Sequence, residues 1–358
     1  MKKKIFTLVC AGLLISCSTS STQESTPIEG QDSNPPPVTS VEWSIPISEV
    51  LDGGPGKDGI PALINPNFSP VQNINYLRDT DLVLGIKNGD DVRAYPHPIL
   101  DWHEIVNDNL GDISVAITYC PLTGTGIGWN RIIKGNETTF GVSGLLYNTN
   151  LIPYDRETDS NWSQILNESV NGELLGEKAD LIKLFETDWR TWKSLFPNSQ
   201  VLSINTGFSR TYGIYPYGDY NTNNDRFLFP VPKDGRLPSK QRVHAIVDGT
   251  DAKAYKFFDF ENGNSIIRDT FKGKEYIIVG NPNFIVSFEM MGELAALDFE
   301  YVHNGSEALL QDNEGTVWNV FGEAISGPRQ GQSLGDSPAF MGMWFSIPAF
   351  YTTELYQN

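Results

Sequence analysis

Short apolar runs separated by glycine-containing turns recur along the chain and predict a β-rich fold. Residues 86–95 (IKNGDDVRAY) and 246–255 (IVDGTDAKAY) are each interrupted by Asn-Gly or Asp-Gly, the strongest short signal for a β-hairpin. Continuous apolar runs predict buried strands at 113–119 and 275–279.

A short helix is expected at residues 187–195. Trp189, Trp192 and Leu195 have helical spacing there, Thr187 is the expected N-cap and Pro197 follows the end. This spacing is more typical of a core-packing helix than of a partner site.

The predicted hairpins and strands recur in the same order in two parts of the chain. Later in each part, Asp155, Glu157 and Trp162 correspond to Asp312, Glu314 and Trp318, so these acids are expected to be turn and salt-bridge residues. We therefore predict a β-rich α+β fold of two related units, from an internal duplication with a short intervening helix. The units are residues 41–200 and 243–358, and residues 201–242 form a Tyr/Asn/Gly-rich connecting loop.

The N-terminus has the pattern of an export signal. Lys2, Lys3 and Lys4 precede an apolar run too short to span a bilayer comfortably, and the sequence LISC ending at Cys17 resembles a lipoprotein lipobox. We expect a signal peptide at 1–16, lipidation of Cys17 and a disordered tether to residue 40, hence export and lipid anchoring to the cell envelope. The alternative is an ordinary cleaved signal with a chance cysteine.

Composition excludes some function classes. The 358 residues carry 26 Lys and Arg against 44 Asp and Glu, a net charge of −18, which speaks against nucleic-acid partners. Three cysteines and four histidines are too few for a disulfide scaffold or a large zinc array.

Cys120 is the leading candidate for chemistry. It follows a predicted buried strand and precedes a Pro-Leu-Thr-Gly turn, and its counterpart in the second unit is Asn281. His103 likewise corresponds to Asn264, so a cysteine and a histidine are both present in one unit and both absent from the other. The alternative is a buried, inert thiol.

A thiolate at Cys120 needs a stabilising neighbour, and His103 is the nearest candidate in sequence. Asp101 or Glu104 could orient its second ring nitrogen, and His97 is a further candidate ligand. The remaining candidates are more remote or more typical of a core: His244, His303, Met341 and Met343.

From about residue 41 onward the sequence resembles the bacterial and archaeal domain-of-unknown-function family numbered three-one-seven-nine. The matching strings are 52–55 (DGGP), 57–61 (KDGIP), 93–96 (RAYP), 101–108 (DWHEIVND), 118–124 (TYCPLTG), 140–148 (FGVSGLLYN), 154–158 (YDRET) and 162–164 (WSQ). The resemblance implies that His103 and Cys120 are family features. Many members have Cys-Pro-x-Cys where this chain has Thr123, which argues against a dithiol redox role here. The family supplies no activity.

Three functions remain open. The first is an envelope lipoprotein that binds a soft metal through Cys120 and His103, with copper favoured over zinc. The second is a noncatalytic module whose tyrosine loop, residues 207–232, presents aromatic side chains to a glycan, protein or small molecule. Its candidate contact residues are Tyr212, Tyr215, Tyr217 and Tyr220. The third is an enzyme with Cys120 as nucleophile, His103 as base and backbone amides after Pro121 as charge stabilisers.

Overall fold

The computed structural model describes residues 42–261 and 263–357, which belong to one compact unit. Strands dominate it, as predicted, and the described residues contain two α-helices, α1 (His97–His103) and α2 (Trp189–Leu195). The expected signal peptide, Cys17 and the tether to residue 40 lie outside the described residues. Within the described part, no helix has the length and apolar character needed to cross a membrane.

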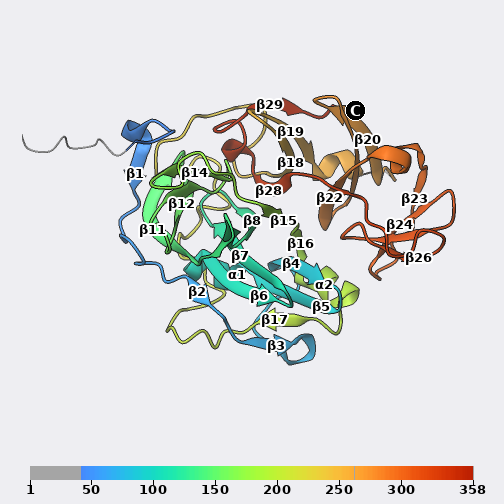
Figure 1. Ribbon diagram of the computed structural model, residues 1–358, viewed down its shortest axis with the longest axis horizontal. Coiled ribbons are helices and arrows are strands. Elements are labelled where there is room, and N and C mark those ends of the chain that lie inside the picture. The colour runs from blue at the N-terminus through green and yellow to red at the C-terminus, as the bar shows by residue number, and fades with distance from the viewer. Residues whose placement is uncertain (1–41, 262, 358) are drawn as a thin grey trace, which may run out of the picture. The chain divides into compact units, whose positions relative to one another are not determined.

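The first half of the body contains three five-stranded sheets (Figure 1). The first has the order β16 (Phe185–Asp188), β4 (Leu82–Asn88), β5 (Asp91–Pro96), β17 (Gln200–Leu202), β3 (Phe68–Pro70). The second has the order β15 (Leu181–Ile182), β8 (Thr125–Asn130), β7 (Ile113–Cys120), β6 (Ile105–Leu110), β2 (Leu63–Ile64). The third has the order β1 (Val50–Asp52), β11 (Phe140–Tyr147), β12 (Asn150–Asp155), β13 (Asn161–Ser163), β14 (Glu168–Asn171). A small ribbon joins β9 (Ile132–Ile133) and β10 (Asn136–Glu137).

The second half contains three four-stranded sheets. Their orders are β28 (Ala339–Met343), β18 (Arg242–Asp248), β19 (Asp251–Lys256), β29 (Thr352–Leu355); then β20 (Ile266–Phe271), β21 (Lys274–Asn281), β22 (Phe284–Glu289), β27 (Gly335–Asp336); and β23 (Phe299–Tyr301), β24 (Ala308–Asp312), β25 (Val317–Asn319), β26 (Ala324–Ser326). Short 3-10 turns complete the described elements: η1 (Ile47–Glu49), η2 (Val71–Asn73), η3 (Phe257–Phe260), η4 (Gly292–Ala296) and η5 (Trp344–Ser346).

The same connectivity occurs in both halves. The hairpin β4–β5 lies between antiparallel β16 and parallel β17, and the hairpin β18–β19 lies between antiparallel β28 and parallel β29. The order β15-β8-β7-β6 is matched by β27-β22-β21-β20, and β11-β12-β13-β14 is matched by β23-β24-β25-β26. Both predicted hairpins turn at a glycine with positive φ, Gly89 at 57° and Gly249 at 60°, a conformation that glycine adopts without steric cost.

Individual side-chain contacts recur as well. Trp162 donates its indole N–H to Asp155 at 3.1 Å, and Trp318 donates to Asp312 at 3.0 Å. The two aspartates also accept backbone N–H groups of the turns that follow them, as expected from their spacing. Each pair therefore fixes a buried tryptophan against a tight turn.

Helix α2 forms where predicted, but Thr187 is not its N-cap. Asp188 occupies that position, and its carboxylate accepts the backbone N–H of Thr191 at 2.7 Å. The expectation fails because β16 continues through Thr187, whose hydroxyl donates to the carbonyl of Asn283 at 3.2 Å. Asp188 is thus the residue at which the chain leaves the strand.

The two halves pack through corresponding strands. Strand β16 contacts β22, and β28 contacts β8, which is the same pairing with the halves exchanged. Figure 1 labels these four strands in the middle of the body, between the rest of the first half and the orange-to-red part of the second half. The packing is close, because an added Cβ at Gly342 would lie 3.0 Å from a methyl carbon of Thr125.

Gly85 tests how tightly α2 packs on β4. An added Cβ there would lie 1.9 Å from the ring of fully buried Trp192, so Gly85→Ala is expected to lower the free energy of unfolding by about 1–3 kcal/mol in urea denaturation. The control, Gly235→Ala, adds a Cβ to an exposed position with nothing within 4 Å and should change the free energy by less than about 0.5 kcal/mol. Equal effects would show that α2 does not constrain β4.

Candidate functional site

Strand register brings His103 and Cys120 to the same end of one hairpin. Ile105 pairs with Thr118 in the antiparallel β6–β7 ladder, and the next contact is the Tyr119 N–H donating to the Glu104 carbonyl at 2.6 Å. His103 precedes Glu104 on one side of this hydrogen bond, and Cys120 follows Tyr119 on the other, so their backbones lie at the same end of the hairpin. The buried strand predicted at 113–119 is confirmed as β7, and Cys120 is its last residue.

Helix α1 ends abruptly at Glu104. This residue has φ 58° and ψ −35°, a combination that L-residues with a Cβ seldom adopt, and its N–H donates to the Leu100 carbonyl. The sharp turn lets the chain pass directly from the helix into β6. It also buries the Glu104 side chain beneath the hairpin end, leaving the residue 6% exposed.

The imidazole of His103 is fully buried and held on both sides. Nδ1 lies 2.7 Å from the Pro61 carbonyl, and Nε2 lies 2.6 Å from the Tyr212 hydroxyl. Burial lowers the pKa of His103, so the ring is neutral at pH 7. Because a carbonyl only accepts, Nδ1 carries the hydrogen, and Nε2 accepts from Tyr212. Asp101 and Glu104 do not orient this ring as expected, since Pro61 and Tyr212 take both nitrogens.

Cys120 is a buried free thiol, 1% exposed. Its sulfur donates to the Thr149 carbonyl at 3.8 Å, and Thr149 lies in the β11–β12 turn with a φ of 68° that is rare for a β-branched residue. Burial, and then the nearby Glu104 carboxyl, raise the pKa of Cys120 to about 11. The thiol is therefore protonated at neutral pH.

Two carboxyl groups share this buried region. Burial, followed by the charge of Asp101, raises the pKa of Glu104 to about 8, and an interaction with Tyr217 opposes the shift. Burial, followed by the charge of Asp81, raises the pKa of Asp101 to about 8. Strongly shifted acids in one place are a common feature of functional sites.

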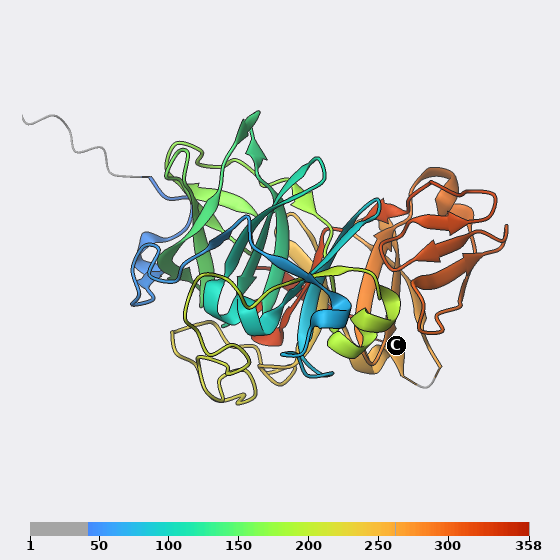
Figure 2. The same cartoon turned by 90° about the horizontal axis from the view of Figure 1, so that it is seen from below.

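The tyrosine loop covers the site. Tyr212 bonds His103, the Tyr215 hydroxyl donates to the Pro121 carbonyl at 2.9 Å, and Trp102 donates its indole N–H to the Ile214 carbonyl at 3.1 Å. Figure 2 shows the yellow-green loop on the same side of the body as α1. Tyr220 is fully buried. These side chains face inward, so the loop acts as a cover over the site.

The turn after Cys120 is closed by its own backbone. The amides of Thr123 and Gly124 donate to the Cys120 carbonyl at 3.3 and 2.8 Å, and the second half braces the turn through the Met343 N–H, which donates to the Thr123 carbonyl at 2.8 Å. These amides are therefore not directed at an incoming substrate.

Four buried polar side chains beside this turn were missed by sequence reasoning. Asn150 donates to both Thr123 and Gln164, and Thr125 also donates to Gln164, all within 2.8–2.9 Å. This network cannot be predicted from the sequence, because nothing in the spacing of residues 118–124 and 162–164 shows that the two segments meet.

His97 lies in a different cluster. Its Nε2 is 3.4 Å from the Glu186 carboxylate, and its ring packs on Tyr119 with centroids 4.4 Å apart. Arg242 pairs with the same carboxylate at 2.5 Å. His97 thus has Glu186 as its nearest charged partner.

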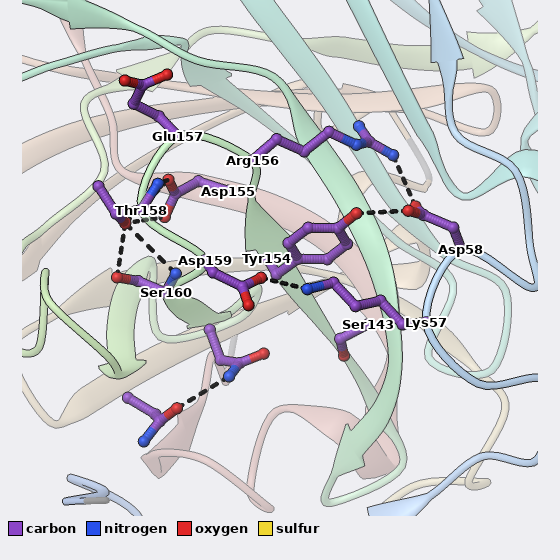
Figure 3. A network of polar contacts seen from close by, with 12 residues as sticks. Lys57, Asp58, Ser143, Tyr154, Asp155, Arg156, Glu157, Thr158, Asp159 and Ser160 are labelled. Atoms are coloured by element: carbon purple, nitrogen blue, oxygen red, sulfur yellow. Dashed lines mark hydrogen bonds and ion pairs between the residues drawn. The ribbon is translucent and has the colours of Figure 1, made fainter.

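A polar network anchors the segment that orients His103 (Figure 3). Tyr154 and Arg156 bind the carboxylate of Asp58 at 2.5 and 2.6 Å, and Lys57 pairs with Asp159. These contacts hold Lys57 and Asp58 against the end of β12 and the turn after it, and the Asp58 N–H also donates to the Val142 carbonyl of β11 at 2.8 Å. The anchored segment leads to the Pro61 carbonyl that accepts from His103. Two strings that are far apart in the sequence, KDGIP and YDRET, meet here.

No group of three or more His, Cys, Asp or Glu side chains among the described residues is arranged to hold a metal ion. The strand register places His103, Glu104 and Cys120 at one hairpin end. Among the described residues no hydrogen bond joins the His103 ring to the Cys120 thiol, and His97 contacts Glu186 instead. Tyr212 and Tyr215 of the tyrosine loop lie over this hairpin end, where they bond His103 and Pro121.

The buried acids predict a pH dependence of stability. Glu104 titrates near its usual 4.5 when unfolded and at about 8 when folded, so the folded protein holds more protons between these values and loses stability as the pH rises through that window. Glu104→Gln mimics the protonated form, and we expect a smaller fall in unfolding free energy between about pH 5 and pH 8, measured by urea denaturation. Exposed Glu173→Gln is the control. An unchanged slope in Glu104→Gln would contradict the assignment.

Comparison with known proteins identifies the family. No curated protein and no solved structure gave a significant match to the chain. The family model described as "Protein of unknown function (DUF3179)" matches residues 57–354, which include every described residue of the site. The chain therefore belongs to this family of proteins of unknown function.

Proposed function

We propose that the protein binds a soft metal ion, copper in its monovalent state, through Cys120 and His103 beneath the tyrosine loop. The observation that carries the proposal is the state of His103. Its Nδ1–H is held by the Pro61 carbonyl, the arrangement that metal-binding histidines use to orient the ring and its tautomer. The lone pair of Nε2 is occupied by a side-chain hydroxyl that a metal ion can displace.

The donor chemistry of Cys120 suits such an ion. A thiolate is a soft ligand that selects monovalent copper, and the ion would replace the thiol proton that burial retains. A nearby cation would stabilise the charged forms of Glu104 and Asp101, which burial disfavours.

Few protein ligands are available, which favours monovalent copper over zinc. A structural zinc site uses four protein ligands, whereas Cys120 and His103 supply two. Thr123 adds little, because its hydroxyl is engaged by Asn150 and Thr125.

The structure gives the other candidate functions less support. A nucleophilic Cys120 would need a lowered pKa and free amides, but burial raises its pKa to about 11 and the following amides bind the Cys120 carbonyl. A recognition surface would need outward-facing tyrosines, and those of the tyrosine loop bind His103, Pro121 and Glu104 instead.

We also propose that the body arose by internal duplication, and that the metal site is a specialisation of the first copy. Support comes from the recurring strand orders and from the matched Trp–Asp pairs. A second matched pair is Tyr95 donating to Asp108 at 2.7 Å and Tyr255 donating to Asp269 at 3.0 Å. In the second copy the position of Cys120 is Asn281, which bonds the Tyr301 hydroxyl at 2.9 Å. The sequence LISC ending at Cys17, which resembles a lipobox, supports the further proposal that the protein is lipid-anchored in the cell envelope.

Copper binding is tested with a competing chelator under reducing conditions, in a background in which Cys10 and Cys17 are changed to serine. Cys120→Ala should abolish high-affinity binding, and His103→Asn should weaken it by at least about tenfold. Tyr212→Phe should tighten it by about 2- to 10-fold, because the hydroxyl that competes for Nε2 is removed. His303→Asn, in the second half, is the control. Equal binding by wild type and Cys120→Ala would refute the proposal.

Because the tyrosine loop lies over Cys120, we expect the thiol to react slowly with alkylating reagents. Alkylation by iodoacetamide, followed by peptide mass spectrometry, should be slow at neutral pH and accelerate as the pH approaches about 11. Tyr215→Phe removes the hydroxyl that donates to Pro121 and should increase the rate at neutral pH several-fold. Tyr301→Phe makes the matched change beside Asn281 and should leave the rate unchanged. A fast wild-type reaction would show that the loop does not cover the thiol.

A further inference from the structure

A cavity of about 200 Å³ lies where the two halves meet. Strands β8 and β16 of the first half and β18, β22 and β28 of the second half contribute to its walls, together with the segments around β15 and β27. It is distinct from the Cys120 site, since none of Cys120, His103 or Glu104 lines it.

Most of the wall is apolar, but two buried hydrogen-bond acceptors in it are unused. Glu186 is 8% exposed and His244 is 5% exposed, and both line the cavity. Among the described residues, Glu186 Oε2 and His244 Nδ1 have no hydrogen bond that meets the usual geometry, and neither does His97 Nε2, which lies 3.4 Å from Glu186 Oε2. An unpaired buried polar atom costs about 1–3 kcal/mol, so a donor from outside the chain, either water or a ligand, would stabilise each acceptor.

The hydrogen bonds around His244 define what Nδ1 requires. The Ser287 hydroxyl donates to Ser337 at 2.9 Å, so its oxygen accepts from His244 Nε2 at 2.8 Å. Burial lowers the pKa of His244 to about 4, and the ring is therefore neutral. With the hydrogen on Nε2, Nδ1 presents a lone pair.

Glu186 presents a second acceptor of the same kind. Burial alone would raise its pKa, but Arg242 and His97 outweigh this effect and keep the pKa below its usual value, so the group is an anion. Arg242 binds Oε1 at 2.5 Å. Oε2, 3.4 Å from His97, lacks a well-formed donor.

These polar residues have apolar or smaller counterparts in the other half. In the first half, Leu84 of β4 pairs with Glu186 of β16, and in the second half His244 of β18 pairs with Met341 of β28. The position of His244 is therefore occupied by Leu84 in the first half, and the position of Glu186 by Met341 in the second. Gly128 and Ser287 likewise occupy matching positions, opposite Ile117 and Ile278. A strictly symmetric junction would be closed by apolar side chains or would carry two copies of each polar group. The wall instead carries one glutamate and one histidine, together with Ser287, Ser337 and the ion pair of Lys183 with Asp336.

We propose that this cavity binds a small molecule with an apolar body and a nitrogen that carries two or more N–H bonds, as in a primary amine or primary amide. The N–H groups match the two acceptors, and the body matches the apolar walls formed by residues such as Ile127 and Phe340. This site is independent of copper binding.

The test uses the full chain and three probes of one size: butylammonium, butyramide and butyrate. Calorimetry and saturation-transfer NMR should show saturable binding of butylammonium, butyramide or both at about 1–10 mM, as expected for so small a ligand, and at least about tenfold weaker binding of butyrate. Preference for the ammonium would identify a cation site, and preference for the amide a neutral one.

Variants taken from the opposite half decide whether the acceptors are responsible. Glu186→Met and His244→Leu each install the residue of the matching position and should weaken binding by at least about tenfold. Met341 lines the same cavity but supplies neither acceptor, so Met341→Leu is the control and should leave binding unchanged. Ala339→Leu narrows the cavity without touching either acceptor and should also abolish binding, which decides the question if Glu186→Met does not fold. Three results would overturn the proposal. The first is that both N–H probes bind at least about 100-fold more weakly than the expected 1–10 mM. The others are equal binding of butyrate and wild-type affinity in the folded acceptor variants.

Discussion

The candidate site depends on a single backbone contact, the hydrogen bond between the Tyr119 amide and the Glu104 carbonyl. It extends the β6–β7 register by one residue beyond Ile105 and Thr118, so the end of α1 is joined to the end of β7. Glu104 must adopt a positive φ to make this junction, and the strain is maintained by the helix before it and the sheet after it. A one-residue shift of this register would turn Cys120 to the opposite face of the sheet.

The repeated framework separates what is structural from what is particular to each half. The buried Trp–Asp and Tyr–Asp pairs occur twice and hold turns and strands in both halves. His103 and Cys120 occur only in the first half, and the unpaired acceptor of His244 only in the second. The residues of both proposed sites therefore coincide with positions at which the halves differ, as expected when one scaffold hosts different sites.

Local patterns in the sequence were sufficient for the elements but not for their environment. The hairpins at Gly89 and Gly249, the strand ending at Cys120 and the helix α2 follow from turn chemistry and periodicity. The partners of His103 could not be predicted, because Pro61 and Tyr212 lie far from it in the sequence and no pattern connects them. The inward orientation of the tyrosines was equally inaccessible, since composition does not distinguish an aromatic cover from an aromatic surface.

Burial has opposite consequences for the two polar regions. Around Cys120 the acidic groups retain their protons, so the region is closed, neutral and receptive to a cation. At the junction of the halves, Arg242 and His97 keep Glu186 ionised, and the unused lone pairs need hydrogen-bond donors, which an amide or an ammonium group supplies. A neutral acid can exchange its proton for a metal ion, whereas an ionised, arginine-paired carboxylate has no proton to release. The same residue type thus differs in its protonation state, according to whether a basic partner is packed beside it.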